Sequence, residues 1–171
     1  MIRGNSSDYD LLRKWSSNFN CDGYYSCEIG VGEGMGSKII MDNVINSYIH
    51  IGIDSYTDNT RDTLISDLLD YSNQGKFRLA NMTERLFMSH PDHQDMTFAF
   101  VHFDCSTKSQ DIMTQAVWFA ERAAPHSRFV FNNHTQYKFD LISEVMKFYR
   151  FEIHGMGDVK CLMARHQKND S

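Results

Sequence analysis

Glycines alternate with other residues in a short segment that follows an apparent strand and precedes an apparent helix. The glycines of this segment are Gly30, Gly32, Gly34 and Gly36. Glycine permits a positive φ and lets a ligand approach the backbone closely, and a glycine-rich loop between strand and helix is a common cofactor site. A tight turn without a ligand is the alternative reading, but such a turn does not require alternating glycines along its whole length.

Acidic residues around this loop predict the charge of its ligand. Glu28 precedes the loop and Glu33 lies within it, and carboxylates at these positions would repel a phosphate but attract a cation. The dinucleotide pattern GxGxxG and the phosphate-loop pattern GxxxxGK[ST] both fail, because the sixth position counted from Gly30 is Met35. The loop therefore suits a cationic ligand better than a phosphorylated one.

Asp54 is the second acidic candidate, because it ends the next apparent strand, 22 residues after Gly32. An acidic residue about 20 residues beyond a glycine loop accepts hydrogen bonds from ribose hydroxyls. A helix-capping or turn aspartate is the alternative interpretation. A cationic ligand with a free ribose and no phosphate describes S-adenosylmethionine.

The segment Glu28-Ile29-Gly30-Val31-Gly32-Glu33-Gly34 resembles the first motif of the class I S-adenosylmethionine-dependent methyltransferases. Asp54 stands where that family keeps its ribose-binding acid. The resemblance implies a Rossmann-like fold and a set of cofactor-binding residues. These are Glu28, Gly30, Gly32, Gly34 and Asp54, with Met82 against the adenine and Asp104 near the methionine end. Met82 as an ordinary core residue is the alternative.

Asp104, Asn132 and Asn133 follow two further apparent strands, whose ends can converge on one site. Carboxylate and amide oxygens suit Mg²⁺ or Ca²⁺, so these residues are candidate ligands of a divalent cation. The chain resembles small O-methyltransferases of the catechol and sugar-modifying types, and those that resemble catechol O-methyltransferase carry Asp at the first position and Asp-Asn at the second. The pair Asn132-Asn133 has one formal charge fewer, and its alternative role is that of turn residues.

Lys108 and His134 are the candidate catalytic bases, because each follows a strand end near the proposed acceptor. The lysine resembles the base of the metal-dependent family, whereas the histidine titrates near neutral pH. Their alternative roles are a solvated surface lysine and a helix cap. The sugar-modifying relatives carry a histidine soon after the fourth-strand acid, and the segment Asp104-Cys105-Ser106-Thr107 has none.

Apolar periodicity predicts the elements that position these residues. Helices are expected over 7–19, 37–45, 60–71, 83–88, 110–123 and 137–149, with Ser7 capping the first, and strands over 24–29, 48–53, 77–80, 97–103, 128–131, 151–154 and 159–164. Alternating strands and helices predict an α/β fold with a doubly wound, mostly parallel seven-stranded sheet and helices on both faces. The short connection between the last two strands predicts a C-terminal antiparallel hairpin.

The composition fits one folded unit of 171 residues, with an N-terminal helix in 1–20 and a core in 21–171. Hydrophobic residues make up 42% of the chain and charged residues 23%, which excludes a disordered or disulfide-dense protein. A net charge of −5 argues against a nucleic-acid partner. The absence of an apolar leader, a long apolar run and metal-type cysteine spacing predicts a cytoplasmic protein without a membrane partner.

These observations predict a methyltransferase that uses adenosylmethionine to O-methylate a small hydroxylated molecule. The chain has few residues beyond its core elements, so we expect an oligomer partner or the first helix to cover the acceptor site. A non-catalytic adenosylmethionine-binding protein and a nucleotide-cofactor oxidoreductase are the rival hypotheses. A nucleic-acid methyltransferase fits the acidic charge less well.

Overall fold

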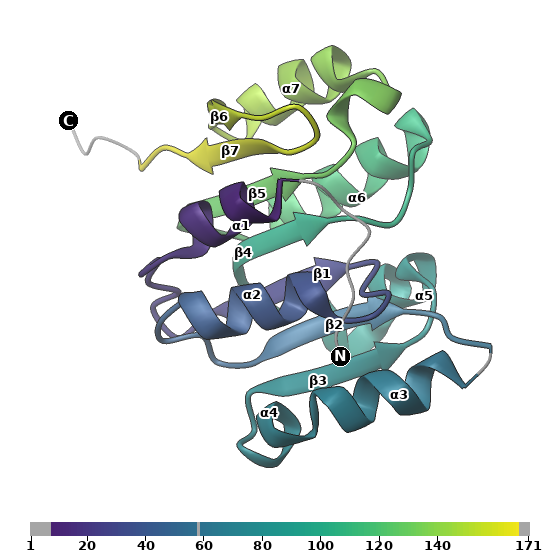
Figure 1. The fold of residues 1–171 in the computed structure, drawn as a ribbon. Coiled ribbons are helices and arrows are strands. Elements are labelled where there is room, and N and C mark those ends of the chain that lie inside the picture. The colour runs from purple at the N-terminus through teal and green to yellow at the C-terminus, as the bar shows by residue number, and fades with distance from the viewer. Residues whose placement is uncertain (1–7, 58, 168–171) are drawn as a thin grey trace.

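The strands form one mixed sheet, as seen in a computed structural model that describes residues 8–57 and 59–167 (Figure 1). The strands are β1 (Tyr25–Ile29), β2 (His50–Asp54), β3 (Phe77–Asn81), β4 (Phe98–Phe103), β5 (Ala123–Phe131), β6 (Phe151–Met156) and β7 (Cys161–Arg165). Their order in the sheet is β3-β2-β1-β4-β5-β7-β6. Because β7 runs antiparallel to both β5 and β6, the predicted seven-stranded, mostly parallel sheet with its closing hairpin is confirmed.

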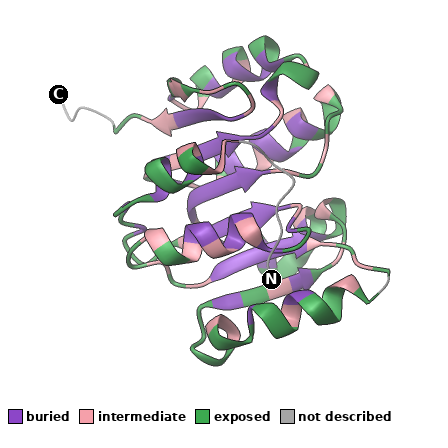
Figure 2. Ribbon diagram, in the orientation of Figure 1, coloured by how far each residue is buried: buried purple, intermediate pink, exposed green. Residues whose placement is uncertain are grey.

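Helices cover both faces of this sheet, as predicted. The α-helices are α1 (Tyr9–Ser16), α2 (Met35–Asn43), α3 (Thr60–Asp67), α4 (Leu69–Asn73), α5 (Glu84–Ser89), α6 (Ser109–Glu121) and α7 (Phe139–Phe148), and short 3₁₀ turns span Pro91–His93 and His134–Gln136. Helices α1 and α2 pack on one face through Leu12, Trp15 and Ile40. Helices α5, α6 and α7 bury apolar side chains against the other face. The strands are accordingly the most buried layer (Figure 2).

The predicted helix over 60–71 is in fact two helices separated by Leu68. This residue has φ −107° and ψ 14°, outside the helical range, and its side chain is completely buried. Leu64 and Leu68 both contribute to a small apolar cluster with Val31 and Phe77. Burial of Leu68 at the break outweighs the uninterrupted apolar periodicity from which one helix was predicted.

The prediction was also wrong at the junction of α6 and β5. The helix ends at Glu121, and β5 already begins at Ala123, well before the predicted start at Arg128. Pro125 lies between the predicted helix over 110–123 and the predicted strand over 128–131, and in the structure it lies where the register between β4 and β5 shifts. Proline is tolerated at such irregularities because it cannot donate a ladder hydrogen bond.

Helix α1 begins after Asp8, which has a left-handed φ of 63°. Ser7, the predicted cap, lies outside the described residues. The Asp8 carboxylate accepts hydrogen bonds from the backbone N–H groups of Val159 and Lys160 at 2.7 and 3.1 Å. The start of α1 is thereby attached to the loop of the closing hairpin. The other elements begin and end within a few residues of their predicted bounds.

Candidate cofactor and acceptor site

The carboxyl ends of the central strands bring most of the predicted site residues to one edge of the sheet. The glycine loop follows β1, Asp54 ends β2, Asp104 follows β4 and Asn132 follows β5. The strand order reverses between β1 and β4. Such a switch point is where ligands bind in open α/β sheets, in the crevice beyond the strand ends.

Asp54 holds the glycine loop in place from the neighbouring strand. Its Oδ2 accepts hydrogen bonds from the N–H groups of Val31 and Gly32, each at 3.0 Å. Gly32 is also held through its carbonyl oxygen, which accepts a hydrogen bond from the Tyr56 hydroxyl at 2.8 Å. Burial raises the pKa of Tyr56 strongly, and the nearby Asp54 charge adds to this, so the hydroxyl remains a donor. The loop conformation is therefore fixed before any ligand arrives.

Gly32 is the loop glycine whose open side faces no protein atom. Its φ is 54°, and a Cβ built on it would meet nothing within 4 Å. By contrast, a Cβ on Gly36 would lie 1.9 Å from Glu28 Oε2, and Gly30 and Gly34 are similarly crowded by Asp104 and Leu64. The protein's own packing thus explains three of the glycines, while Gly32 leaves room for a ligand to approach the backbone.

Glu28 does not face solvent but lies beneath α2, with only 1% of its surface exposed. Its Oε1 accepts a hydrogen bond from the Ser37 hydroxyl at 2.9 Å, and its Oε2 lies 2.7 Å from His102 Nδ1. Burial raises the pKa of Glu28, whereas the Ser37 hydrogen bond and the Lys160 charge act in the opposite direction and favour the carboxylate. The predicted role of Glu28 toward the cofactor would therefore be exerted through the loop above it.

A buried lysine connects Glu28 to the acceptor end of the crevice. Lys160 Nζ lies 3.1 Å from His102 Nε2 and donates to Asn132 Oδ1 at 2.8 Å. The Asn132 amide in turn donates to an Asp104 carboxylate oxygen. Burial raises the pKa of Asp104 and lowers the pKa of His102 to about 3. Asp104 and Asn132 therefore meet, as predicted, within a larger buried hydrogen-bond network.

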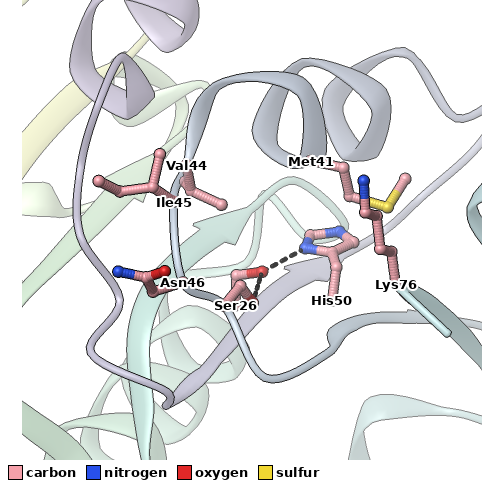
Figure 3. A pocket seen from close by; sticks show the side chains of 8 residues that line it. Ser26, Met41, Val44, Ile45, Asn46, His50 and Lys76 are labelled. Carbon is pink, nitrogen blue, oxygen red and sulfur yellow. Dashed lines mark hydrogen bonds between the residues drawn. The ribbon is translucent and has the colours of Figure 1, made fainter. Parts of the chain in front are cut away.

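A second arm of the network runs to the amino edge of the sheet. His50 Nε2 lies 3.0 Å from the Ser37 hydroxyl, and His50 Nδ1 lies 3.0 Å from the Ser26 hydroxyl. Ser26 also contacts Ser47, with 2.9 Å between their hydroxyl oxygens. Figure 3 shows Ser26 and His50 together in the wall of a pocket of about 350 Å³, which Lys76 also lines. This pocket lies at the strand starts and is separate from the predicted cofactor crevice.

The remaining predicted residues lie around the crevice in different settings. Asn133 has a left-handed φ of 53° and begins the turn after β5. His134 is buried, with its Nε2 2.8 Å from the Gly157 carbonyl oxygen. Lys108 is exposed at the start of α6, and Met82 is partly buried against the main core cluster. The structure thus leaves Lys108 and His134 as separate candidates for proton transfer.

The predicted divalent cation does not fit the donors at this edge. Glu28, His102 and Asp104 each have a ligand atom within 4.8 Å of the others, so the residue types are suitable. However, Asn132 Oδ1 already accepts a hydrogen bond from Lys160, and the lysine also occupies one nitrogen of His102. A divalent cation would lie beside a buried ammonium group and would be repelled by it.

The network residues His102, Lys160, His50 and Ser37 were missed by the sequence analysis. His102 is a polar side chain within the otherwise mostly apolar strand predicted over 97–103. A histidine in a strand buried on both faces requires a buried partner, and Glu28 at the same position of an adjacent strand could have been suspected. Lys160, 58 residues from His102, gave no local signal.

Comparisons with known proteins define the fold. No protein-family model and no curated protein matches the chain. A putative O-methyltransferase from Klebsiella pneumoniae superposes with a TM-score of 0.69 at 7% identity, covering 97% of this chain and 84% of that one. A precorrin-6y C5,15-methyltransferase from Geobacter metallireducens gives 0.65 at 9% identity, with coverages of 96% and 94%. An rRNA methylase from Streptococcus thermophilus gives 0.64 at 10% identity, with coverages of 98% and 99%. The chain therefore has the fold of the class I S-adenosylmethionine-dependent methyltransferases, as its first motif predicted.

Proposed function

We propose that the protein is an adenosylmethionine-dependent methyltransferase. The observation that carries this proposal is the Asp54 carboxylate, which holds the Gly32 loop at the switch point of a methyltransferase-type sheet. Because the loop is already ordered and Gly32 is open toward solvent, a cofactor could bind there without rearranging the backbone. The O-, C- and rRNA-methyltransferase neighbours share the overall fold.

In this proposal the cofactor lies across the carboxyl ends of β1, β2 and β4. The Asp54 carboxylate oxygen that does not bind the loop would accept hydrogen bonds from the ribose hydroxyls. The backbone of Gly32 would contact the cofactor. Met82 would contact the adenine, and Asp104 would face the cationic methionine end. Gly30, Gly34 and Glu28 would act by keeping the loop and the start of α2 in position.

We infer that the acceptor is a small hydroxylated molecule and that the product is its methyl ether. Bound adenosylmethionine would supply the methyl group, and the attacking hydroxyl must then give its proton to a base. Lys108 and His134 are the candidates for that role. The net charge of −5 favours such a substrate over RNA.

The cellular setting is part of the proposal. The four cysteines, Cys21, Cys27, Cys105 and Cys161, are free thiols, as expected of a protein that works in the reducing cytoplasm. Within the described residues, every helix is too short or too polar to cross a membrane.

Titration calorimetry with adenosylmethionine, adenosylhomocysteine and NAD tests the cofactor. We expect both adenosyl compounds to bind and NAD not to bind. Asp54→Ala and Gly32→Val should each weaken binding about tenfold or more, whereas Lys76→Ala, at the opposite edge of the sheet, should not. Binding of NAD alone would show that the crevice serves a nucleotide oxidoreductase instead.

A second experiment separates catalysis from binding. The protein is incubated with methyl-labelled adenosylmethionine and a panel of catechols, phenols, sugars and RNA. Transfer of label to a hydroxylated small molecule is the expected result. Tight cofactor binding without transfer to any acceptor would identify a non-catalytic binding protein, and transfer to RNA would correct the acceptor class.

A further inference from the structure

Lys160 is a completely buried lysine at the carboxyl edge of the sheet. Its Nζ contacts His102 and Asn132, and the charges of Asp104 and Glu28 are close enough to raise its pKa, although burial lowers it more. The ammonium also lies 5.3 Å from the centre of the Tyr9 ring. A buried cation is retained at such a cost only where several partners compensate it.

The start of α1 fixes this lysine. The Asp8 carboxylate accepts hydrogen bonds from the backbone N–H groups of Val159 and Lys160, and the Tyr9 ring covers the ammonium. The backbone on which Lys160 stands is therefore anchored from outside the sheet. At the other end of the side chain, the ammonium group contacts Asn132 and His102.

The hydrogen bonds of Lys160 determine which nitrogen of His102 carries the proton. An ammonium group can only donate, so His102 Nε2 must accept and must be unprotonated. The neutral ring then carries its hydrogen on Nδ1, which donates to Glu28 Oε2 at 2.7 Å. Neither nitrogen of His102 retains a lone pair for a metal ion.

The oxygen atoms that could ligate a cation at this edge also have hydrogen-bond partners. Asn132 Oδ1 is occupied by the lysine, and the Asn132 amide N–H donates to one carboxylate oxygen of Asp104. Glu28 accepts hydrogen bonds from both Ser37 and His102. Every residue that could ligate a cation here is thus already bound to Lys160 or to a group that Lys160 orients.

We propose that the Lys160 ammonium is the fixed positive charge of the crevice, in the place that a divalent cation would otherwise take. It balances Glu28 and Asp104 and excludes a metal ion. The further consequence that methyl transfer needs no metal rests on the proposed function, whereas the exclusion of metal does not.

Mn²⁺ binding, followed by electron paramagnetic resonance, tests the exclusion. A His154→Ala parent is used, because Glu152, His154 and His166 form a separate surface group whose ligand atoms also lie within 4.8 Å of one another. In this parent we expect no stoichiometric binding. Adding Lys160→Ala should raise Mn²⁺ affinity about tenfold or more, because Glu28, His102 and Asp104 then lose their competing cation. Adding Lys160→Met should raise the affinity less, because methionine removes the charge but still fills the space that the ion would occupy.

Stoichiometric Mn²⁺ binding by the parent that is lost in Asp104→Asn would overturn the proposal. So would a folded Lys160→Ala variant that gains no affinity. Should Lys160→Ala fail to fold, the pair Lys160→Met and Lys160→Met/Glu28→Gln decides by urea unfolding. We expect Glu28→Gln to restore part of the stability lost in Lys160→Met, because it removes the carboxylate left without its cation. Equal or lower stability of the double variant would contradict charge compensation.

A third experiment tests whether methyl transfer needs a metal ion. Adenosylmethionine affinity and methyl transfer by the His154→Ala parent should be unchanged by EDTA. Loss of transfer on chelation, restored by Mg²⁺, would overturn the metal-free reading. If the parent binds no adenosylmethionine at all, the proposed function fails, while the Mn²⁺ and unfolding experiments still judge the role of Lys160.

Discussion

Glu28 Oε2 lies 2.7 Å from His102 Nδ1, and the two residues are direct partners in the register of β1 and β4. Two series of hydrogen bonds end at this carboxyl group. One comes from Lys160 through His102, and the other comes from His50 through Ser37. The acid that opens the glycine motif is therefore a structural centre, on which the first turn of α2 and the middle of the sheet both depend.

The contact between Gly36 and Glu28 predicts a compensating pair of substitutions. Gly36→Ala should lower the free energy of unfolding by about 1–3 kcal/mol, because the new Cβ would overlap Glu28 Oε2. In a Glu28→Ala background the same substitution should cost almost nothing, since the obstructing carboxylate is absent. Urea unfolding of the four proteins measures the coupling. An equal cost in both backgrounds would show that Gly36 is required for another reason.

Substitutions at Asp54 should separate its two acceptor roles. Asp54→Asn keeps one oxygen that can accept from Val31 or Gly32, whereas Asp54→Ala keeps none. We expect Asp54→Ala to lose about 1 kcal/mol of stability and about tenfold or more in adenosylmethionine affinity, with Asn intermediate in both. Tyr56→Phe, which removes the hydroxyl that donates to Gly32, should weaken affinity less than Asp54→Ala. Titration calorimetry on this series tests whether Asp54 binds the cofactor. Wild-type affinity in Asp54→Ala would contradict that role.

The parts of the structure that could be predicted from the sequence are those governed by local pattern. Alternating apolar segments and short connections predict the mostly parallel sheet and its closing hairpin, and glycine spacing identifies the loop. Leu68 and Pro125 misled the prediction because burial and a register shift, both tertiary effects, decided the local conformation. The site was predicted at the ends of strands, where topology brings residues together.

The polar network could not be predicted in the same way, because its partners are far apart in the chain. Glu28 and His102 are separated by 74 residues, and His102 and Lys160 by 58. His102 is conspicuous as a polar residue in an apolar strand, but only the pairing of β1 with β4 and the return of β7 beside β5 bring the three residues together. Lys160 falls in the predicted strand over 159–164 and lies just before β7 in the structure, and its own segment gives no sign of complete burial.

His50 should control part of the acid stability of the fold. Burial lowers the pKa of His50 to about 3, and His102 contributes in the same direction. Because the unfolded chain binds a proton near pH 6.5 and the folded chain does not, stability that is present above pH 6.5 is lost as pH falls toward 3. His50→Gln should reduce the slope of unfolding free energy against pH in this window by about 1.4 kcal/mol per pH unit. His90→Gln, an exposed position, serves as the control, and an unchanged slope in His50→Gln would contradict a neutral His50.

The two candidate bases can be compared by variants that preserve their structural contacts. The His134 ring is oriented by the Gly157 carbonyl, which accepts from Nε2 and leaves Nδ1 able to take a proton, whereas Lys108 is an exposed side chain. We therefore expect His134→Gln to lower kcat about 100-fold, with cofactor affinity retained because glutamine can still donate to Gly157. Lys108→Met should lower kcat less, and Lys76→Met, at the opposite edge, should not change it. A larger fall in kcat for Lys108→Met than for His134→Gln would assign proton transfer to Lys108. His134 would then only stabilise the hairpin loop through its contact with Gly157.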